Sequence, residues 1–210
     1  MAILLVNNYL LRPRERIRRY VRVLRALTRE RVELVGFHEV RPGFEVGPDV
    51  EAIILSGSEA CLSRPEDRPF FTDLASFLRE VDLPVLGICF GHQLIAHAFG
   101  APVVDMGRVV EGPEEVVVEE PDIIFSSWDR GDKILVAESH RDMVAQLPEG
   151  FELLAKSASC PIEAMRHALR PIYGVQFHPE RKPEPWAGER WDGLDVLRRF
   201  LSIMAGHELK

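Results

Sequence analysis

The first half of the chain alternates short apolar runs with segments whose apolar positions recur every three or four residues. A short continuous apolar run is typical of a buried strand, and the three- or four-residue period is typical of an amphipathic helix. The expected strands are residues 2–6, 32–37, 52–55 and 84–88. The expected helices begin at Pro13, span residues 70–81, and run through Leu94 and Phe99 to a stop at Gly100. This order predicts an α/β fold, with a mostly parallel central sheet and helices on both faces.

The second half has a different pattern. After Pro102, short apolar stretches follow one another without helical segments between them, at residues 115–118, 123–125, 134–137, 151–155, 162–165 and 172–177. We expect strands here, either added to the central sheet or forming a small antiparallel layer, and then a last helix over about 194–204. Because no repeat, low-complexity tract or linker interrupts the pattern, residues 1–210 are expected to form one domain.

Composition narrows the class of protein. The hydrophobic fraction of 46% and the charged fraction of 28% are those of an ordinary globular chain. No apolar run approaches the roughly 20 residues of a membrane helix, and the N-terminal segment lacks the basic region and cleavage site of a signal peptide. Three cysteines exclude a disulfide scaffold and favour a reducing compartment. We therefore expect a cytoplasmic protein without membrane contact.

Charge is unevenly distributed along the chain. The net charge of −7 argues against a nucleic-acid partner. Nine of the 22 arginines nevertheless lie between Arg12 and Arg31, a stretch whose acids are Glu15 and Glu30. On an amphipathic first helix these arginines would form either a solvated face or a docking surface for an acidic partner.

Candidate chemistry begins at residues 87–93, Gly-Ile-Cys-Phe-Gly-His-Gln, where an apolar strand runs through Cys89 into a helix. This order resembles a nucleophile elbow, a sharp turn that exposes a reactive side chain. Gly87 and Gly91 leave room for the turn, and the helix N-terminus offers amide donors to a developing anion. The alternative is a buried structural cysteine at a strand end.

A nucleophilic cysteine needs a base, and the base needs an orienting group. The strand at 172–177 ends in His178-Pro179-Glu180, and residues two apart on an extended chain point to the same side. Glu180 can therefore reach the ring of His178. Taken alone, the segment would be read as a surface histidine in a charged turn. Two such strand ends on one sheet are much less easily explained by chance.

These two segments resemble the class I (triad) glutamine amidotransferase family, which has a flavodoxin-like core. The likeness extends to residues 54–58, Ile-Leu-Ser-Gly-Ser, and 138–142, Glu-Ser-His-Arg-Asp. The resemblance implies hydrolysis of glutamine to glutamate and ammonia through a thioester on Cys89. His178 would move protons and Glu180 would hold its imidazole. It implies neither a cofactor nor a metal, and no zinc-ligand cluster or phosphate-binding loop is present in the sequence.

The resemblance also assigns supporting roles. The amide of Phe90 and the loop at Gly57 and Ser58 would form the oxyanion hole. The substrate glutamine would be bound by Gln93, Ser139 and His140.

The oxyanion loop departs from the family pattern, which usually has a second glycine or Gly-Pro where this chain has Ser58-Glu59. If the donor amide needs positive φ, Ser58 hinders it and the glutaminase is weak or differently gated. Cys61 in the same loop could lie near Cys89 as a regulatory thiol or be an ordinary loop residue. Cys160 is expected to be structural.

Within the family, the chain is most similar to the amidotransferase part of GMP synthetases. The shared segments are residues 139–142, 147–151, 155–157, 160–162 and 173–180, whereas Arg181 and residues 182–191 depart from that branch. The sequence lacks the phosphate loop of a synthetase module, so a separate synthetase subunit would receive the ammonia. Two alternatives stay open. One is a stand-alone hydrolase or transferase acting on another glutamine-like or γ-glutamyl substrate, and the other is a catalytically silent regulatory or binding subunit.

Overall fold

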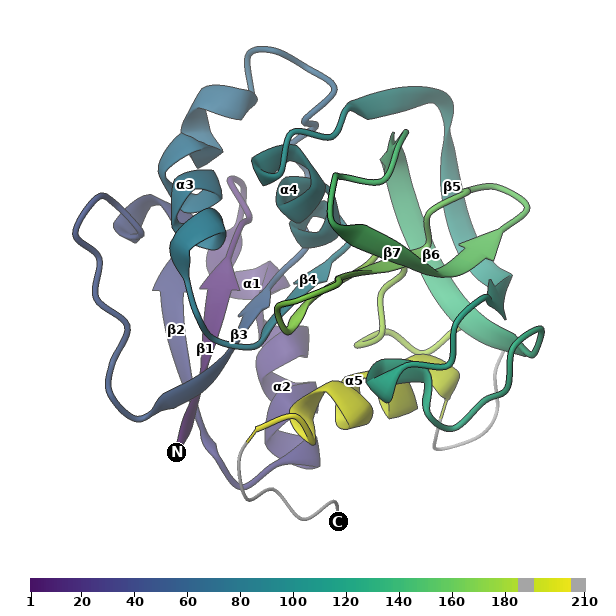
Figure 1. Cartoon of the computed structure of the whole chain (residues 1–210). Helices are drawn as coiled ribbons and strands as arrows, with labels where there is room; N and C mark the ends of the chain where they lie inside the picture. The colour runs from purple at the N-terminus through teal and green to yellow at the C-terminus, as the bar shows by residue number, and fades with distance from the viewer. Residues whose placement is uncertain (185–190, 205–210) are drawn as a thin grey trace.

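The computed structural model describes residues 1–184 and 191–204, in which nine strands form one mixed sheet (Figure 1). The order across the sheet is β2-β1-β3-β4-β9-β8-β7-β5-β6. The strands are β1 (Ala2–Asn7), β2 (Arg31–Gly36), β3 (Val50–Leu55), β4 (Val85–Ile88), β5 (Val103–Val118), β6 (Lys133–Val144), β7 (Phe151–Ser157), β8 (Ala164–His167) and β9 (Ile172–Val175).

The strand β9 joins the two halves of the sheet. It pairs in parallel with β4 and antiparallel with β8. On one side of it β4, β3, β1 and β2 are all parallel, which confirms the pattern predicted for the first half. On the other side β8, β7, β5 and β6 are antiparallel and extend the same sheet. The C-terminal ends of β4 and β9, far apart in sequence, therefore lie side by side.

Helices cover both faces of the parallel part, as expected. They are α1 (Pro13–Arg16), α2 (Arg18–Leu27), α3 (Thr72–Glu80), α4 (Phe90–Ala98) and α5 (Asp192–Leu201), with short 3-10 helices η1 (Phe37–Glu39), η2 (Arg68–Phe71) and η3 (Ile123–Phe125). Alternate side chains of β3 serve opposite faces: Ile53 packs in the core with α3 and α4, whereas Ile54 packs with α2 and α5. Burial on both faces explains why these strands are continuous apolar runs.

Several boundaries differ from the expected ones. Residues 123–125 form the 3-10 helix η3 and not a strand, because Pro121 has no amide to continue a ladder and Asp122 accepts the amide of Phe125. The strand β5 begins at Val103, twelve residues before the apolar stretch that predicted it. Its early part is mostly exposed and contains several charged residues and two glycines, so that pairing with β6 contributes more to its stability than burial does.

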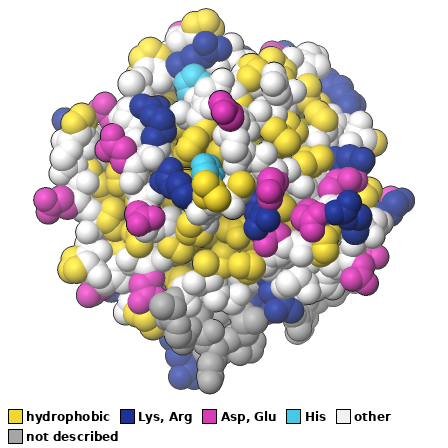
Figure 2. Space-filling model, in the orientation of Figure 1, with side chains coloured by type: hydrophobic (Ala, Val, Ile, Leu, Met, Phe, Trp, Pro, Cys, Tyr) yellow, Lys and Arg dark blue, Asp and Glu magenta, His cyan; other side chains and the backbone are white. Residues whose placement is uncertain are grey.

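The arginine-rich segment forms the amphipathic helix that the sequence predicts, although it is divided at Ile17 into α1 and α2. Ile17, Tyr20 and Leu24 are buried, and all nine arginines between Arg12 and Arg31 are exposed. On the face shown in Figure 2, charged side chains of both signs are interspersed around a hydrophobic centre. The concentration of exposed arginines on α1 and α2 is therefore not repeated on the face shown in Figure 2.

The last helix begins two residues earlier than expected and ends at Leu201. Residues 185–190, within the stretch that departs from the GMP synthetase pattern, lie outside the described residues. In the described part of the chain no helix has the length and apolarity to cross a membrane.

Candidate active site

The site lies where β4 and β9 end. Cys89 follows β4 directly, and its amide donates to the carbonyl of Val175 at the end of β9, at 2.8 Å. His178 comes three residues after β9, and its amide donates to the carbonyl of Ala137 on β6, also at 2.8 Å. Backbone hydrogen bonds therefore fix both chain segments against the sheet.

Cys89 occupies a strained turn. Its φ of 52° and ψ of −103° lie in a region that residues other than glycine rarely adopt. Such strain, about 1–3 kcal/mol, persists only where the surroundings enforce it. Here the enforcement is close packing: a Cβ on Gly87 would lie 2.4 Å from the carbonyl oxygen of Gly91, and one on Gly91 would lie 2.7 Å from Leu55. The turn has the geometry of the elbow expected from the sequence.

His178 lies between Cys89 and Glu180. Its Nδ1 is 2.9 Å from Oε1 of Glu180, and the sulfur of Cys89 also interacts with the ring. The side chains of His178 and Glu180 are only 3% and 1% exposed. Because Nδ1 is engaged by Glu180, Nε2 is the nitrogen that faces the sulfur.

The electrostatics of the site favour a charged imidazole. Burial lowers the pKa of His178, but the Glu180 carboxylate and the sulfur of Cys89 outweigh burial and raise this pKa to about 9. Burial raises the pKa of Glu180, whereas His178 and the neighbouring Arg181 lower it below the ordinary value. Near neutral pH the pair is therefore an imidazolium and a carboxylate, an arrangement that stabilises a thiolate.

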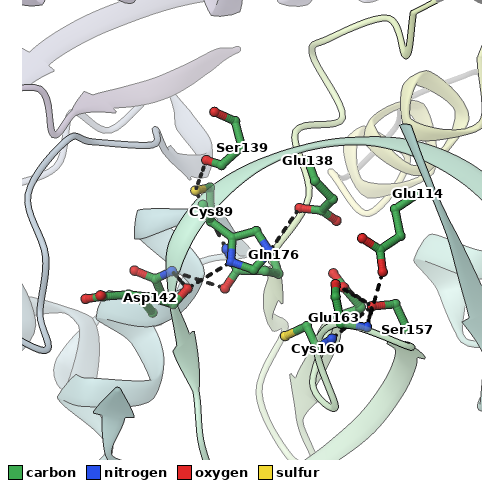
Figure 3. A network of polar contacts seen from close by, with 12 residues as sticks. Cys89, Glu114, Glu138, Ser139, Asp142, Ser157, Cys160, Glu163 and Gln176 are labelled. Atoms are coloured by element: carbon green, nitrogen blue, oxygen red, sulfur yellow. Dashed lines mark hydrogen bonds and ion pairs between the residues drawn. The ribbon is translucent and has the colours of Figure 1, made fainter. Parts of the chain in front are cut away.

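Two further groups contact the sulfur of Cys89 (Figure 3). The Nε2 of Gln176 donates to it at 3.7 Å, and the thiol lies 3.8 Å from the carbonyl oxygen of Ser139. Sequence reasoning gave Gln176 no role. Its position two residues before His178, on the same side of an extended chain, was the available signal.

Two of the three predicted oxyanion residues offer a free amide. Within the described residues, the amides of Phe90 and Ser58 have no hydrogen-bond acceptor, and both residues line the active-site cavity. The amide of Gly57 is instead engaged, since it donates to the hydroxyl of Tyr20 at 2.9 Å. Ser58 is not at positive φ, and its Oγ donates to the carbonyl of Asn8 at 2.7 Å. The serine thus fixes the loop through its own side chain.

The three residues expected to bind substrate line the same cavity, which has a volume of about 250 Å³. The Nε2 of Gln93 donates to the carbonyl of Asp142 at 2.8 Å and to Oε1 of Gln176 at 3.1 Å. Both hydrogen bonds of this nitrogen are therefore made within the protein. The Nδ1 of His140 is 3.0 Å from the carbonyl oxygen of Asp142. Ser139 lies between His140 and the buried Glu138 on β6.

Other residues around this cavity were missed by sequence reasoning. Tyr9 and Tyr20, whose rings pack edge to face, lie against Gly57 close to His178. Arg16, Arg141 and Arg181 also line it, together with the acids Glu59 and Asp142. No local motif marks these residues, because they come from segments that only the fold brings together.

The other two cysteines are free thiols. Cys61 lines the same cavity as Cys89 and is half-buried, and burial raises its pKa. Cys160 is buried in the turn between β7 and β8, where its thiol contacts the carbonyl of Ile162 at 3.5 Å. In the part of the chain that the structure describes, no group of three or more His, Cys, Asp or Glu side chains could hold a metal ion.

Comparison with known proteins identifies the family. The model of the family "Glutamine amidotransferase class-I" matches residues 16–191. The glutamine-hydrolysing GMP synthase subunit of Pyrococcus abyssi is 45% identical over 124 residues, which are 59% of this chain and 62% of that protein. The match thus spans less than two thirds of that relative's length. The corresponding protein of Archaeoglobus fulgidus is 38% identical over 155 residues, 74% of this chain and 76% of that protein.

Solved structures agree in fold. A Thermoplasma acidophilum protein, described as a candidate subunit of GMP synthase, superposes with a TM-score of 0.78 at 30% identity, covering 97% of this chain and 93% of that one. A glutamine amidotransferase of Thermotoga maritima superposes with a TM-score of 0.73 at 19% identity and covers 99% of both chains.

Proposed function

This chain belongs to the class-I glutamine amidotransferase family, and we propose that it hydrolyses the side-chain amide of glutamine to glutamate and ammonia. The observation that carries the proposal is the strained turn at Cys89, with the buried His178–Glu180 pair against its sulfur. A structural cysteine needs neither the strain nor the charged partners. A free reactive thiol also suits the reducing cytoplasm expected from the sequence.

In the proposed reaction the thiolate of Cys89 attacks the amide carbon of glutamine. The oxygen becomes an oxyanion, which the amides of Phe90 and Ser58 stabilise. The carbon–nitrogen bond then breaks, His178 gives its proton to the leaving ammonia, and a thioester remains. Water attacks the thioester and gives a proton back to His178, and cleavage of the carbon–sulfur bond releases glutamate. Glu180 stabilises the charged imidazole throughout.

We further propose that the ammonia passes to a separate synthetase subunit of the GMP synthase type. The similarity to the glutamine-hydrolysing GMP synthase subunits of P. abyssi and A. fulgidus supports this choice of partner. The exposed arginines of α2 suit contact with an acidic surface on such a subunit.

The direct test is to incubate the purified protein with glutamine and measure glutamate and ammonia. We expect slow hydrolysis by the protein alone and faster hydrolysis after addition of a nucleotide-loaded synthetase of the GMP synthase type. Asparagine is the control substrate, because its shorter side chain does not place the amide carbon against Cys89. Hydrolysis of another γ-glutamyl amide in preference to glutamine would favour the stand-alone hydrolase. Absence of any turnover or thioester would favour the silent subunit.

Reversing the charge of exposed arginines on α2 is expected to weaken binding to the synthetase. Arg18, Arg22 and Arg25 are exposed along this helix, away from the cavity that contains Cys89. The triple substitution to glutamate should lower affinity at least about tenfold at low salt and affect it less at high salt. Binding is measured by titration calorimetry, with unstimulated glutaminase activity as the internal control. Unchanged affinity would show that α2 is a solvated face.

A further inference from the structure

Two carboxyl groups lie buried beneath the active site. Glu138 is on β6, next to Ser139, and Glu163 directly precedes β8; they are 2% and 0% exposed. Figure 3 shows both side chains in one polar network with Glu114. Oε1 of Glu163 accepts a hydrogen bond from Ser157 at 2.7 Å. Both oxygens of Glu138 and Oε2 of Glu163 accept no hydrogen bond from a donor group in the described residues.

Buried carboxylates without donors are strongly destabilising, so this arrangement needs a proton. The charge of Glu163 acts on Glu138, so two ionised carboxylates would repel each other in this buried place, and a proton shared between them removes that repulsion. Burial raises the pKa of Glu138 well above its ordinary value, and the neighbouring Glu163 raises it further. Burial also raises the pKa of Glu163, to about 7, although its hydrogen bonds with Ser157 and Glu138 lower it in part.

The ring of His140 supplies an independent argument for a protonated Glu138. Its Nδ1 must donate, because the atom 3.0 Å away is the carbonyl oxygen of Asp142. Burial lowers the pKa of His140, so the ring is neutral and its Nε2 is an acceptor. That Nε2 faces Oε2 of Glu138 at 3.5 Å. A carboxylate at Glu138 would place a charged oxygen against the lone pair of Nε2, and a neutral acid at Glu138 avoids that repulsion.

The acid pair also lies near the reactive sulfur, since a charge on Cys89 contributes to the raised pKa of Glu138. Other titratable groups face the pair from separate elements. They are Glu114 on β5 and Cys160 in the turn after β7, and His92 on α4 faces His140. The charges of Arg108 and of the His178 imidazolium act on His140, but none of the groups that act on the two carboxyl groups brings a positive charge, so a proton is the means of neutralising the pair.

We propose that Glu138, kept as a neutral acid by sharing a proton with Glu163, is a positioning residue that holds Ser139 and His140 in the shape that receives glutamine. Loss of this proton at rising pH places a charge beneath the glutamine-binding segment and weakens its hold on the substrate. The inference about glutamine rests on the proposed function, whereas the shared proton does not.

The pair predicts a defined dependence of stability on pH. A carboxyl group whose pKa rises on folding contributes stability that is fully present below its unfolded value, near 4.5, and is lost as pH rises through the folded value. For Glu163 that window extends from about 4.5 to about 7.

Two variants of Glu138 test the proposal, Glu138→Gln and Glu138→Ala. The matched control is Glu111→Gln, because Glu111 is an exposed carboxylate on β5 that pairs with Ser139 of β6. The amide of a glutamine at 138 can donate to Glu163 and to His140 without titrating. We expect the melting temperature of Glu138→Gln to equal that of the wild type at pH 5 and to exceed it by roughly 5 °C or more at pH 8. The melting temperature of Glu111→Gln should equal that of the wild type at both pH 5 and pH 8.

The protonated acid is also observable directly. Infrared spectra of the wild type at pH 7 should contain the carbonyl stretch of a protonated carboxyl group, which Glu138→Gln removes and Glu111→Gln retains. Absence of this band in the wild type, together with melting curves that keep the same offset at every pH, would overturn the shared proton whether or not the protein hydrolyses glutamine.

Kinetics test the positioning role. The KM for glutamine should rise roughly fivefold or more between pH 6.5 and 8.5 in the wild type and remain flat in Glu138→Gln. In Glu138→Ala it should be high at both pH values, because the side chain that supports His140 is lost. If all three proteins have the same KM profile, the acid pair is structural only. If no variant and no wild-type sample hydrolyses glutamine while the infrared band is present, the proposed function fails and the acid pair stands.

Discussion

Replacement of Cys89 by alanine is expected to reduce glutamine hydrolysis by at least about 10⁴-fold, close to the uncatalysed background. The substitution removes the atom that forms the thioester and leaves the oxyanion donors of Phe90 and Ser58 without a bond-forming partner. Loss of a nucleophile on this scale corresponds to about 5.5 kcal/mol of transition-state stabilisation. The measurement is single-turnover production of glutamate, combined with mass spectrometry of the acid-quenched protein, in which only the wild type should carry a glutamyl group.

Cys61→Ala is the matched control, since Cys61 lines the same cavity but has no contact with His178 in the described structure. This variant should still form the thioester on Cys89. Wild-type turnover in Cys89→Ala would contradict the assignment of the nucleophile. Loss of the thioester in Cys61→Ala alone would instead assign the chemistry to the second thiol.

The fold and the centre of the site were predictable because their signals are local. A buried parallel strand is a continuous apolar run, and the turn at Cys89 carries its glycines within two residues on either side. His178 and Glu180 are two residues apart, so extended geometry alone predicts their contact. The pairing of β4 with β9, which brings Cys89 and His178 together, was not predicted. The family resemblance implied only that these two residues act together.

The rest of the site depends on contacts between segments that have no common pattern. The hydroxyl of Tyr20 accepts a hydrogen bond from the amide of Gly57. Tyr20 lies on α2, a helix that the sequence predicts only as an amphipathic surface element. Glu138 and Glu163 approach each other from β6 and the turn before β8, and binary patterning predicts charged residues to be exposed there. Such buried polar groups break the local rule, which is where functional constraint is expected.

Replacement of Gly87 by alanine is expected to cause the largest loss of stability among single substitutions near the site. A Cβ there would lie 2.4 Å from the carbonyl oxygen and 2.5 Å from the carbonyl carbon of Gly91, atoms of the backbone in the first turn of α4. Backbone held at both ends cannot move aside as a flexible side chain can. We expect the free energy of unfolding to fall by about 3 kcal/mol or more, measured by urea denaturation.

Gly47→Ala is the control for the loss of glycine flexibility as such. Its Cβ would make ordinary contacts, 3.7 Å from Val50 and 3.8 Å from Glu33, and its φ is not positive. This variant should change the free energy of unfolding by no more than about 0.5 kcal/mol.

The two variants also separate the effect of packing on stability from its effect on catalysis. Gly87→Ala must push the start of α4 away from β4, and that shift moves both the sulfur of Cys89 and the amide of Phe90. Among the molecules that remain folded, hydrolysis should therefore fall more steeply than stability. If Gly87→Ala were as stable and active as Gly47→Ala, close packing would not be the source of the strain at Cys89.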